Sequence, residues 1–119
     1  PLSNNEGGGL YMLNGVVADC VISNNWVSGW HRAGGGVRML NGLIRTSTIC
    51  SNRVQGTGSG GAGSGGGVCL TAGTVEDCLF DGNVVKESGS APSGGGVYMS
   101  AGTVRNCTFR NNRAENGFT

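Results

Sequence analysis

The chain has 119 residues, of which 25 are glycine and 13% are charged, and its formal net charge at pH 7 is +1. This length predicts a single domain, 1–119, and a near-neutral charge without a dominant basic stripe argues against a nucleic-acid-binding protein. No apolar run is long enough to cross a membrane as a helix, so we expect no membrane insertion by this segment.

Triple glycines recur along the chain and mark an internal repeat. Aligned on these triplets, four segments match over 19 residues without a gap, with glycine at the ninth position and asparagine at the last. The repeat cores are 7–25, 34–52, 65–83 and 94–112. A period of this length is typical of solenoid proteins, in which each repeat packs only on its neighbours.

The first part of each core predicts a short, half-buried strand. Its fourth and sixth positions are apolar in every copy, while the position between them is mixed, which is the two-residue period of a strand. The apolar positions are Leu10, Val37, Val68 and Val97, and then Met12, Met39, Leu70 and Met99. We expect these side chains to face the interior.

Two further apolar columns follow the ninth-position glycine. They are Val17, Ile44, Val75 and Val104, and then Ile22, Ile49, Phe80 and Phe109. Between them stand Cys20, Ser47, Cys78 and Cys107, where cysteine is expected to act as a small interior side chain. Phe109 is accordingly predicted to be a buried ring whose truncation costs about 3–5 kcal/mol.

Each core ends on an asparagine, and this column predicts a polar ladder inside the stack. Its members are Asn25, Asn52, Asn83 and Asn112, and a small apolar column follows at Val27, Val54, Val85 and Ala114. Stacked asparagines hydrogen-bond to one another and to the backbone of a bend. Because one copy cannot bury its apolar face alone, the copies must stack with equivalent strands in parallel. The sequence therefore predicts an all-β parallel β-helix of about four coils.

The segments between the cores vary in length and composition. The first, 26–33, holds both tryptophans and the only histidine, and exposed aromatic residues of this kind commonly contact sugars or protein partners. Trp26, Trp30 and His31 are therefore candidate ligand contacts; alternatively, Trp26 covers the outer wall and Trp30 folds back over it. The insert 56–67 is typical of a flexible loop up to its last three residues, which open the third core.

Five cysteines cannot all pair within the chain. Cys78 and Cys107 stand on adjacent coils about 4.8 Å apart, within the Cα distance range of a disulfide. Stacked side chains point the same way, however, which does not suit the disulfide dihedral, so we expect buried thiols. No Cys-x-x-Cys motif occurs and His31 is the only histidine, so neither a metal nor another cofactor is expected.

The motifs Gly-Gly-[Val/Leu] and Cys-x-Phe-x-x-Asn resemble the repeats of the chlamydial polymorphic outer-membrane proteins and of related autotransporter-like passenger domains of bacteria. Residues 80–83 and 109–112 match Phe-x-x-Asn directly, and Ile22 and Ile49 replace the phenylalanine in the first two copies. The resemblance covers nearly the whole chain. It implies a right-handed β-helix and an extracellular or cell-surface location, although the chain shows no signal-peptide pattern, and it implies architecture far more than activity.

Two functions are compatible with this fold. The first is a non-catalytic structural or adhesive module of a bacterial surface or secreted protein. The alternative is a carbohydrate-active module, polysaccharide-binding or lyase-like, with an outer groove near Asp19, Arg45 and Asp77. The two aspartates stand two coils apart, about 9.6 Å, near the carboxylate separation used for glycosidic cleavage. Aspartate also favours the bend before a strand, so no catalytic residue is assigned and the non-catalytic function is preferred.

A stack of four coils leaves two open ends, each with unpaired backbone groups and exposed core. The segments 1–6 and 115–119 are too short to cap these ends, so we expect the chain to self-associate. A homodimer through like ends is preferred, because contact between unlike ends extends into a fibre. The other partners expected of a surface module are a glycan or a host-surface protein.

Overall fold

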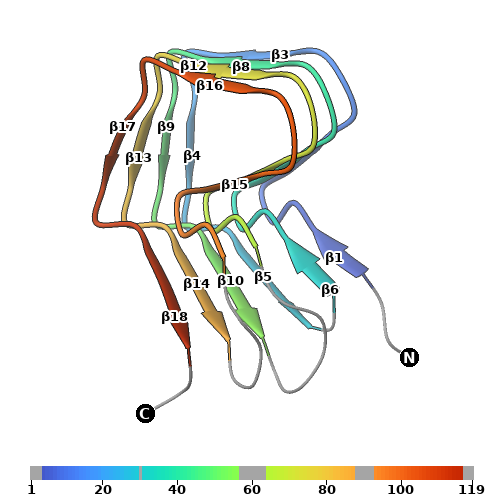
Figure 1. The fold of residues 1–119 in the computed structure, drawn as a ribbon, viewed down its shortest axis with the longest axis vertical. Helices are drawn as coiled ribbons and strands as arrows, with labels where there is room; N and C mark the ends of the chain where they lie inside the picture. The colour runs from blue at the N-terminus through green and yellow to red at the C-terminus, as the bar shows by residue number, and fades with distance from the viewer. Residues whose placement is uncertain (1–3, 30, 57–63, 88–92, 117–119) are drawn as a thin grey trace.

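The structure, a computed structural model, describes residues 4–29, 31–56, 64–87 and 93–116. The described residues form short strands joined by bends, and they wind into a parallel β-solenoid (Figure 1). The predicted all-β fold is therefore confirmed. Within these ranges no helix is long and apolar enough to cross a membrane.

Four parallel sheets run along the solenoid, and each takes one strand from every copy. The first sheet holds β2 (Leu10–Met12), β7 (Val37–Met39), β11 (Val68–Leu70) and β15 (Val97–Met99). The second holds β3 (Val16–Ala18), β8 (Leu43–Arg45), β12 (Thr74–Glu76) and β16 (Thr103–Arg105). The third holds β4 (Val21–Ser23), β9 (Thr48–Cys50), β13 (Leu79–Asp81) and β17 (Thr108–Arg110). The fourth holds β5 (Trp26–Gly29), β10 (Arg53–Gly56), β14 (Val84–Glu87) and β18 (Arg113–Asn116), and a two-stranded sheet pairs β1 (Asn4–Glu6) with β6 (His31–Ala33).

The strands pair in the register that the aligned copies predict. Val17, Ile44, Val75 and Val104 are successive partners in the second sheet. Ile22, Ile49, Phe80 and Phe109 are successive partners in the third. Because differences in length fall between the repeat cores, they leave the strand pairing undisturbed.

The solenoid has fewer turns than predicted. The chain passes through the first sheet at β2, β7, β11 and β15, which closes three turns, and β16, β17 and β18 begin another. The expectation of about four coils is thus corrected to about three turns, because no described segment after β18 returns to the first sheet. In Figure 1 the chain winds counter-clockwise while it advances toward the viewer, so the solenoid is right-handed.

The main hydrophobic core lies between the first three sheets. Its fully buried side chains come from the two middle copies: Val37, Met39, Ile44, Ile49, Val68, Leu70, Val75 and Phe80. The predicted inward columns are confirmed, but their last members are open to solvent, since Met99 is 43% exposed and Phe109 48% exposed. The expectation that Phe109 is buried is wrong although its register is right, because none of the described coils covers its outer side.

The fourth sheet carries a second, smaller apolar face. Val27, Val54 and Val85 are buried there, and β5 contacts both β1 and β6. Figure 1 shows the fourth sheet extending away from the three-walled core. The predicted small apolar column is thus buried in three copies, while Ala114, in the last copy, is exposed.

The asparagine column forms the predicted ladder. Asn25 Nδ2 donates to Asn52 Oδ1 at 3.0 Å, Asn52 Nδ2 to Asn83 Oδ1 at 3.0 Å, and Asn83 Nδ2 to Asn112 Oδ1 at 2.9 Å. Each accepting oxygen also receives the backbone N–H of the preceding asparagine at 3.0 to 3.1 Å. Asn52 and Asn83 are fully buried, so the ladder satisfies polar groups that are costly to bury alone.

The triple glycines let neighbouring coils approach closely. A Cβ on Gly36 would lie 2.7 Å from the carbonyl oxygen of Gly67 and 2.8 Å from Nδ2 of Asn52. Two residues earlier, Gly34 has a φ of +68°, a left-handed conformation that glycine adopts without steric cost. A side chain at Gly36 would therefore separate two coils or displace the asparagine ladder.

Candidate functional site

The predicted groove residues lie at the corner between the second and third sheets. Asp19, Thr46, Asp77 and Asn106 occupy this corner, one in each copy, with φ angles of 55°, 50°, 52° and 51°. Aspartate and asparagine visit the left-handed region more readily than most residues, because their short side chains bond locally. The bend itself thus accounts for aspartate at these positions.

A hollow of about 420 Å³ follows this corner along the stack. It is lined by Thr46, Ser47, Thr48, Asp77, Cys78, Leu79, Asn106 and Thr108. Of the three predicted groove residues only Asp77 lines it; Asp19 and Arg45 are exposed elsewhere on the same side. The structure therefore places the hydroxyl of Thr46 and the amide of Asn106 beside Asp77. The second carboxylate that the predicted groove required does not line this hollow.

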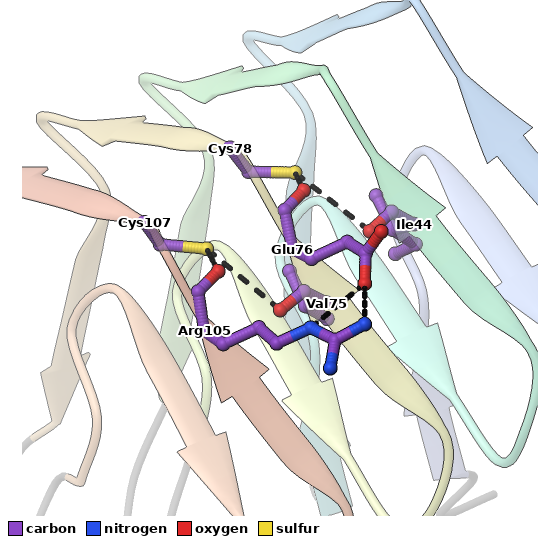
Figure 2. A network of polar contacts seen from close by, with 6 residues as sticks. All are labelled: Ile44, Val75, Glu76, Cys78, Arg105 and Cys107. Carbon is purple, nitrogen blue, oxygen red and sulfur yellow. Dashed lines mark hydrogen bonds and ion pairs between the residues drawn. The ribbon is translucent and has the colours of Figure 1, made fainter.

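A column of three thiols and one hydroxyl marks the inner side of this corner, and each member donates to a backbone carbonyl two residues earlier. Cys78 Sγ donates to the carbonyl of Glu76 at 3.1 Å, and Cys107 Sγ donates to that of Arg105 at 3.3 Å (Figure 2). Ser47 Oγ makes the equivalent bond at 2.8 Å. Sequence reasoning treated this column as apolar filling and missed its donor role, although the serine in one copy was the available signal.

Burial determines the chemistry of these thiols. Desolvation raises the pKa of Cys78 to about 11, against a smaller opposing effect of a backbone hydrogen bond from Ser47. Cys78 is therefore protonated at neutral pH and is a weak nucleophile. No disulfide joins the five cysteines; Cys69 and Cys78 are buried, whereas Cys50 and Cys107 are only partly buried. The expectation that the column is interior fails for Cys20, which is exposed because it stands on the first coil.

Ion pairs between adjacent coils neutralise the carboxylates that flank the corner. Arg105 Nε donates to Glu76 Oε1 at 2.9 Å (Figure 2), and Arg110 Nε donates to Asp81 Oδ2 at 3.0 Å. The hydrogen bond from Arg110, with a second from Asn111, holds the pKa of Asp81 below its usual value. Asp81 is thus kept ionised, which is the opposite of what a general acid requires.

The candidate aromatic contacts divide between two sheets. Trp26 begins β5 and is 63% exposed, and its partner in the neighbouring strand is Arg53. His31 begins β6, which contacts β5. Trp30 lies outside the described residues. The structure thus brings the backbones of Trp26 and His31 onto contacting strands, and the side chain of Trp26 is exposed.

No group of three or more histidine, cysteine, aspartate or glutamate side chains in the described ranges is placed to hold a metal ion. Comparison with protein families, with curated protein sequences and with solved structures returns no match to this chain. The likeness to the chlamydial outer-membrane repeats therefore rests on the Gly-Gly-[Val/Leu] and Cys-x-Phe-x-x-Asn motifs alone.

Proposed function

We propose that the chain is a non-catalytic structural or adhesive module of a bacterial surface or secreted protein. The observation that carries this proposal is that its recurring polar side chains bond one coil to the next. The asparagines pair along their ladder, and Arg105 and Arg110 pair with carboxylates of the preceding coil. A catalytic site instead gathers groups with shifted pKa values around a pocket that receives substrate.

The adhesive role assigns the outer surface to a glycan or a host-surface protein, and the repeat motif supports an extracellular or cell-surface location. The exposure of Trp26 supports a contact at segment 26–33, which also contains Trp30 and His31. Tryptophan is enriched among the residues that dominate binding energy, because its large ring buries much apolar area at little entropic cost.

Glycan arrays and host-cell binding test this role. Trp26→Ala is expected to weaken binding about tenfold, a typical loss for an aromatic anchor. Tyr11→Ala is the matched control, because Tyr11 is an exposed aromatic residue of the same copy but lies on the first sheet. Equal binding by wild type and both variants would contradict a contact at 26–33, and no binding to any glycan or cell would contradict the adhesive role.

One observation favours the alternative, a carbohydrate-active module: the hollow that Asp77 shares with Thr46 and Asn106. A polysaccharide-cleavage assay distinguishes the two functions, and the non-catalytic proposal expects no turnover. Turnover that disappears in Asp77→Ala but persists in Asp81→Ala would establish the alternative. Asp81 is a suitable control because its carboxylate is already paired with Arg110.

A further inference from the structure

The fourth sheet has two faces. One carries the buried valine column, and the residues that alternate with these valines point to the opposite face, which we call the outer face. One column of the outer face consists of Trp26, Arg53, Val84 and Arg113, which are successive partners in the sheet. Arg53 and Val84 are partly exposed although a strand pairs with each of them on both sides. The outer face is therefore open along the flank of the solenoid, where the fourth sheet extends away from the main core (Figure 1).

Arg53 differs from the arginines that form ion pairs. Arg105, Arg110 and Arg113 each bond a carboxylate. The strand partners of Arg53 are instead a tryptophan and a valine, and no ion pair within the described residues includes its guanidinium. Its Nε is buried without a hydrogen-bond partner in the described part of the chain, although buried polar atoms are usually paired. Arg53 is thus a positive charge that the described fold leaves uncompensated.

The outer face as a whole carries more positive than negative charge. Its second column consists of Ser28, Gln55, Lys86 and Glu115. Glu115 is the one carboxylate of the two columns, and it lies 3.1 Å from Arg113 Nε and 4.0 Å from Lys86 Nζ. Three basic side chains therefore share one acidic side chain, and Arg53 takes no part in that pairing. Charge complementarity then favours a negatively charged partner for this face.

We propose that the outer face of the fourth sheet binds an acidic polysaccharide, with Trp26 packed on a sugar ring and Arg53 bonded to a carboxylate or sulfate group beside it. This inference rests on the proposed adhesive function and names the class of glycan for the contact at 26–33. A guanidinium donates two parallel hydrogen bonds to a carboxylate, and a sulfate group offers oxygens for the same arrangement. An indole ring supplies a large flat apolar surface for the C–H side of a sugar.

The spacing of the column favours a polysaccharide over an acidic protein. Trp26 and Arg53 stand on adjacent strands, about 4.8 Å apart, which is comparable with the length of one sugar unit. Arg113 stands two strands beyond Arg53, about 9.6 Å away. A polymer that lies along the stack axis and carries acidic groups at regular intervals can therefore reach the tryptophan and both arginines at once.

Binding of the wild-type chain to dextran sulfate and to dextran tests the class of ligand, because the two polymers share one sugar backbone and differ in charge. Dextran sulfate or alginate, whose acidic groups are carboxylates, is expected to bind at least about tenfold more tightly than dextran, and added salt is expected to weaken that binding. The tighter of the two acidic polymers identifies the acidic group. Equal binding of dextran would overturn the proposal, and so would equal binding of polyglutamate, which has carboxylates but no sugar rings.

Arg53→Gln tests the residue. This variant is expected to bind the preferred acidic polymer about tenfold more weakly than the wild type, a typical loss for an arginine at the centre of a contact. Arg45→Gln is the matched control, because it removes the same charge from an exposed arginine of the same copy on the second sheet, and it is expected to bind like the wild type. Equal losses in the two variants would show that binding depends on net charge alone and would overturn the site.

The failure of this inference is distinguishable from the failure of the adhesive role. If glycan or host-cell binding depends on Trp26 but not on Arg53, the adhesive role stands and the acidic class is wrong. If no glycan and no cell is bound, both are wrong.

A second variant at the same position keeps the test interpretable if circular dichroism shows that Arg53→Gln has lost its β-structure. Arg53→Lys keeps the positive charge and removes the paired donors of the guanidinium, so it is expected to lose part of the affinity for the acidic polymer. Wild-type affinity in a folded Arg53→Lys variant would overturn the paired hydrogen bonds from Arg53.

Discussion

The two stacked phenylalanines show how the position of a residue along the solenoid determines its contribution to stability. Phe80 and Phe109 have ring centroids 4.7 Å apart and planes inclined by 10°. Phe80 is fully buried because a coil lies on each side of it, whereas Phe109 is 48% exposed. The same residue at the same column therefore removes different areas of apolar surface from water.

Phe80→Ala is expected to lower the free energy of unfolding by about 3–5 kcal/mol, as truncation of a buried aromatic ring does. Phe109→Ala is expected to lower it by about half as much, because hydrophobic stabilisation scales with the apolar area that is buried. Chemical denaturation, at a protein concentration low enough to keep the chain monomeric, measures the free energy of unfolding of both variants. Equal losses would show that the outer side of Phe109 is covered in the isolated chain.

At the scale of a structural element, the asparagine ladder links the corners of all four copies. Asn83 donates to the carbonyl of Ile49 at 2.8 Å and to Asn112 Oδ1, and its own oxygen accepts two bonds from Asn52. Its side chain thus takes part in four hydrogen bonds without access to water. Removing the amide leaves several buried polar groups unpaired at once.

Asn83→Leu is expected to lower the free energy of unfolding by more than about 3 kcal/mol, because each buried polar group left unsatisfied costs about 1–3 kcal/mol. Asn41→Leu is the control, since Asn41 is exposed and surface substitutions usually change stability by less than about 0.5 kcal/mol. Thermal or chemical unfolding distinguishes them. A similar small loss in both variants would mean that the ladder contributes little net stability.

At the scale of the whole molecule, the solenoid is a one-dimensional array in which each copy contacts only its neighbours. The stability of such arrays is approximately a sum of repeat and interface contributions. The described core follows this pattern, since its fully buried residues lie in the two copies that have a neighbour on each side. Removing one copy in register should therefore shorten the array without destroying it.

Deletion of 75–103 joins Thr74 to Val104, the next residue in the aligned repeat, and is expected to leave a less stable but cooperatively folded β-solenoid. Deletion of 75–102 differs by one residue and joins Thr74 to Thr103, which moves Val104 and its neighbours to the opposite face. This second variant is expected to lose cooperative unfolding. Thermal unfolding followed by circular dichroism compares the two deletion variants. Equally cooperative unfolding of both would contradict a strand register set by the repeat columns.

The sequence by itself determined the strand register, the inward columns and the asparagine ladder. These features were predictable because each copy repeats the same two-residue alternation, and stacking identical units aligns their equivalent residues. For the candidate site, the sequence brought Asp19, Arg45 and Asp77 to one outer side but did not show that only Asp77 lines a hollow. The orientation of a corner side chain depends on the backbone angles, which the alternation of residues does not specify.

Only the tertiary structure decided how the copies differ from one another. Phe109, Met99 and Cys20 occupy inward columns and yet are exposed, because burial in a stack depends on whether a coil lies on both sides. The pairing of Glu76 with Arg105 and the direction of the asparagine ladder depend on contacts between residues about thirty positions apart. A pattern read within one copy carries no information on these contacts, because they form only where one coil meets the next.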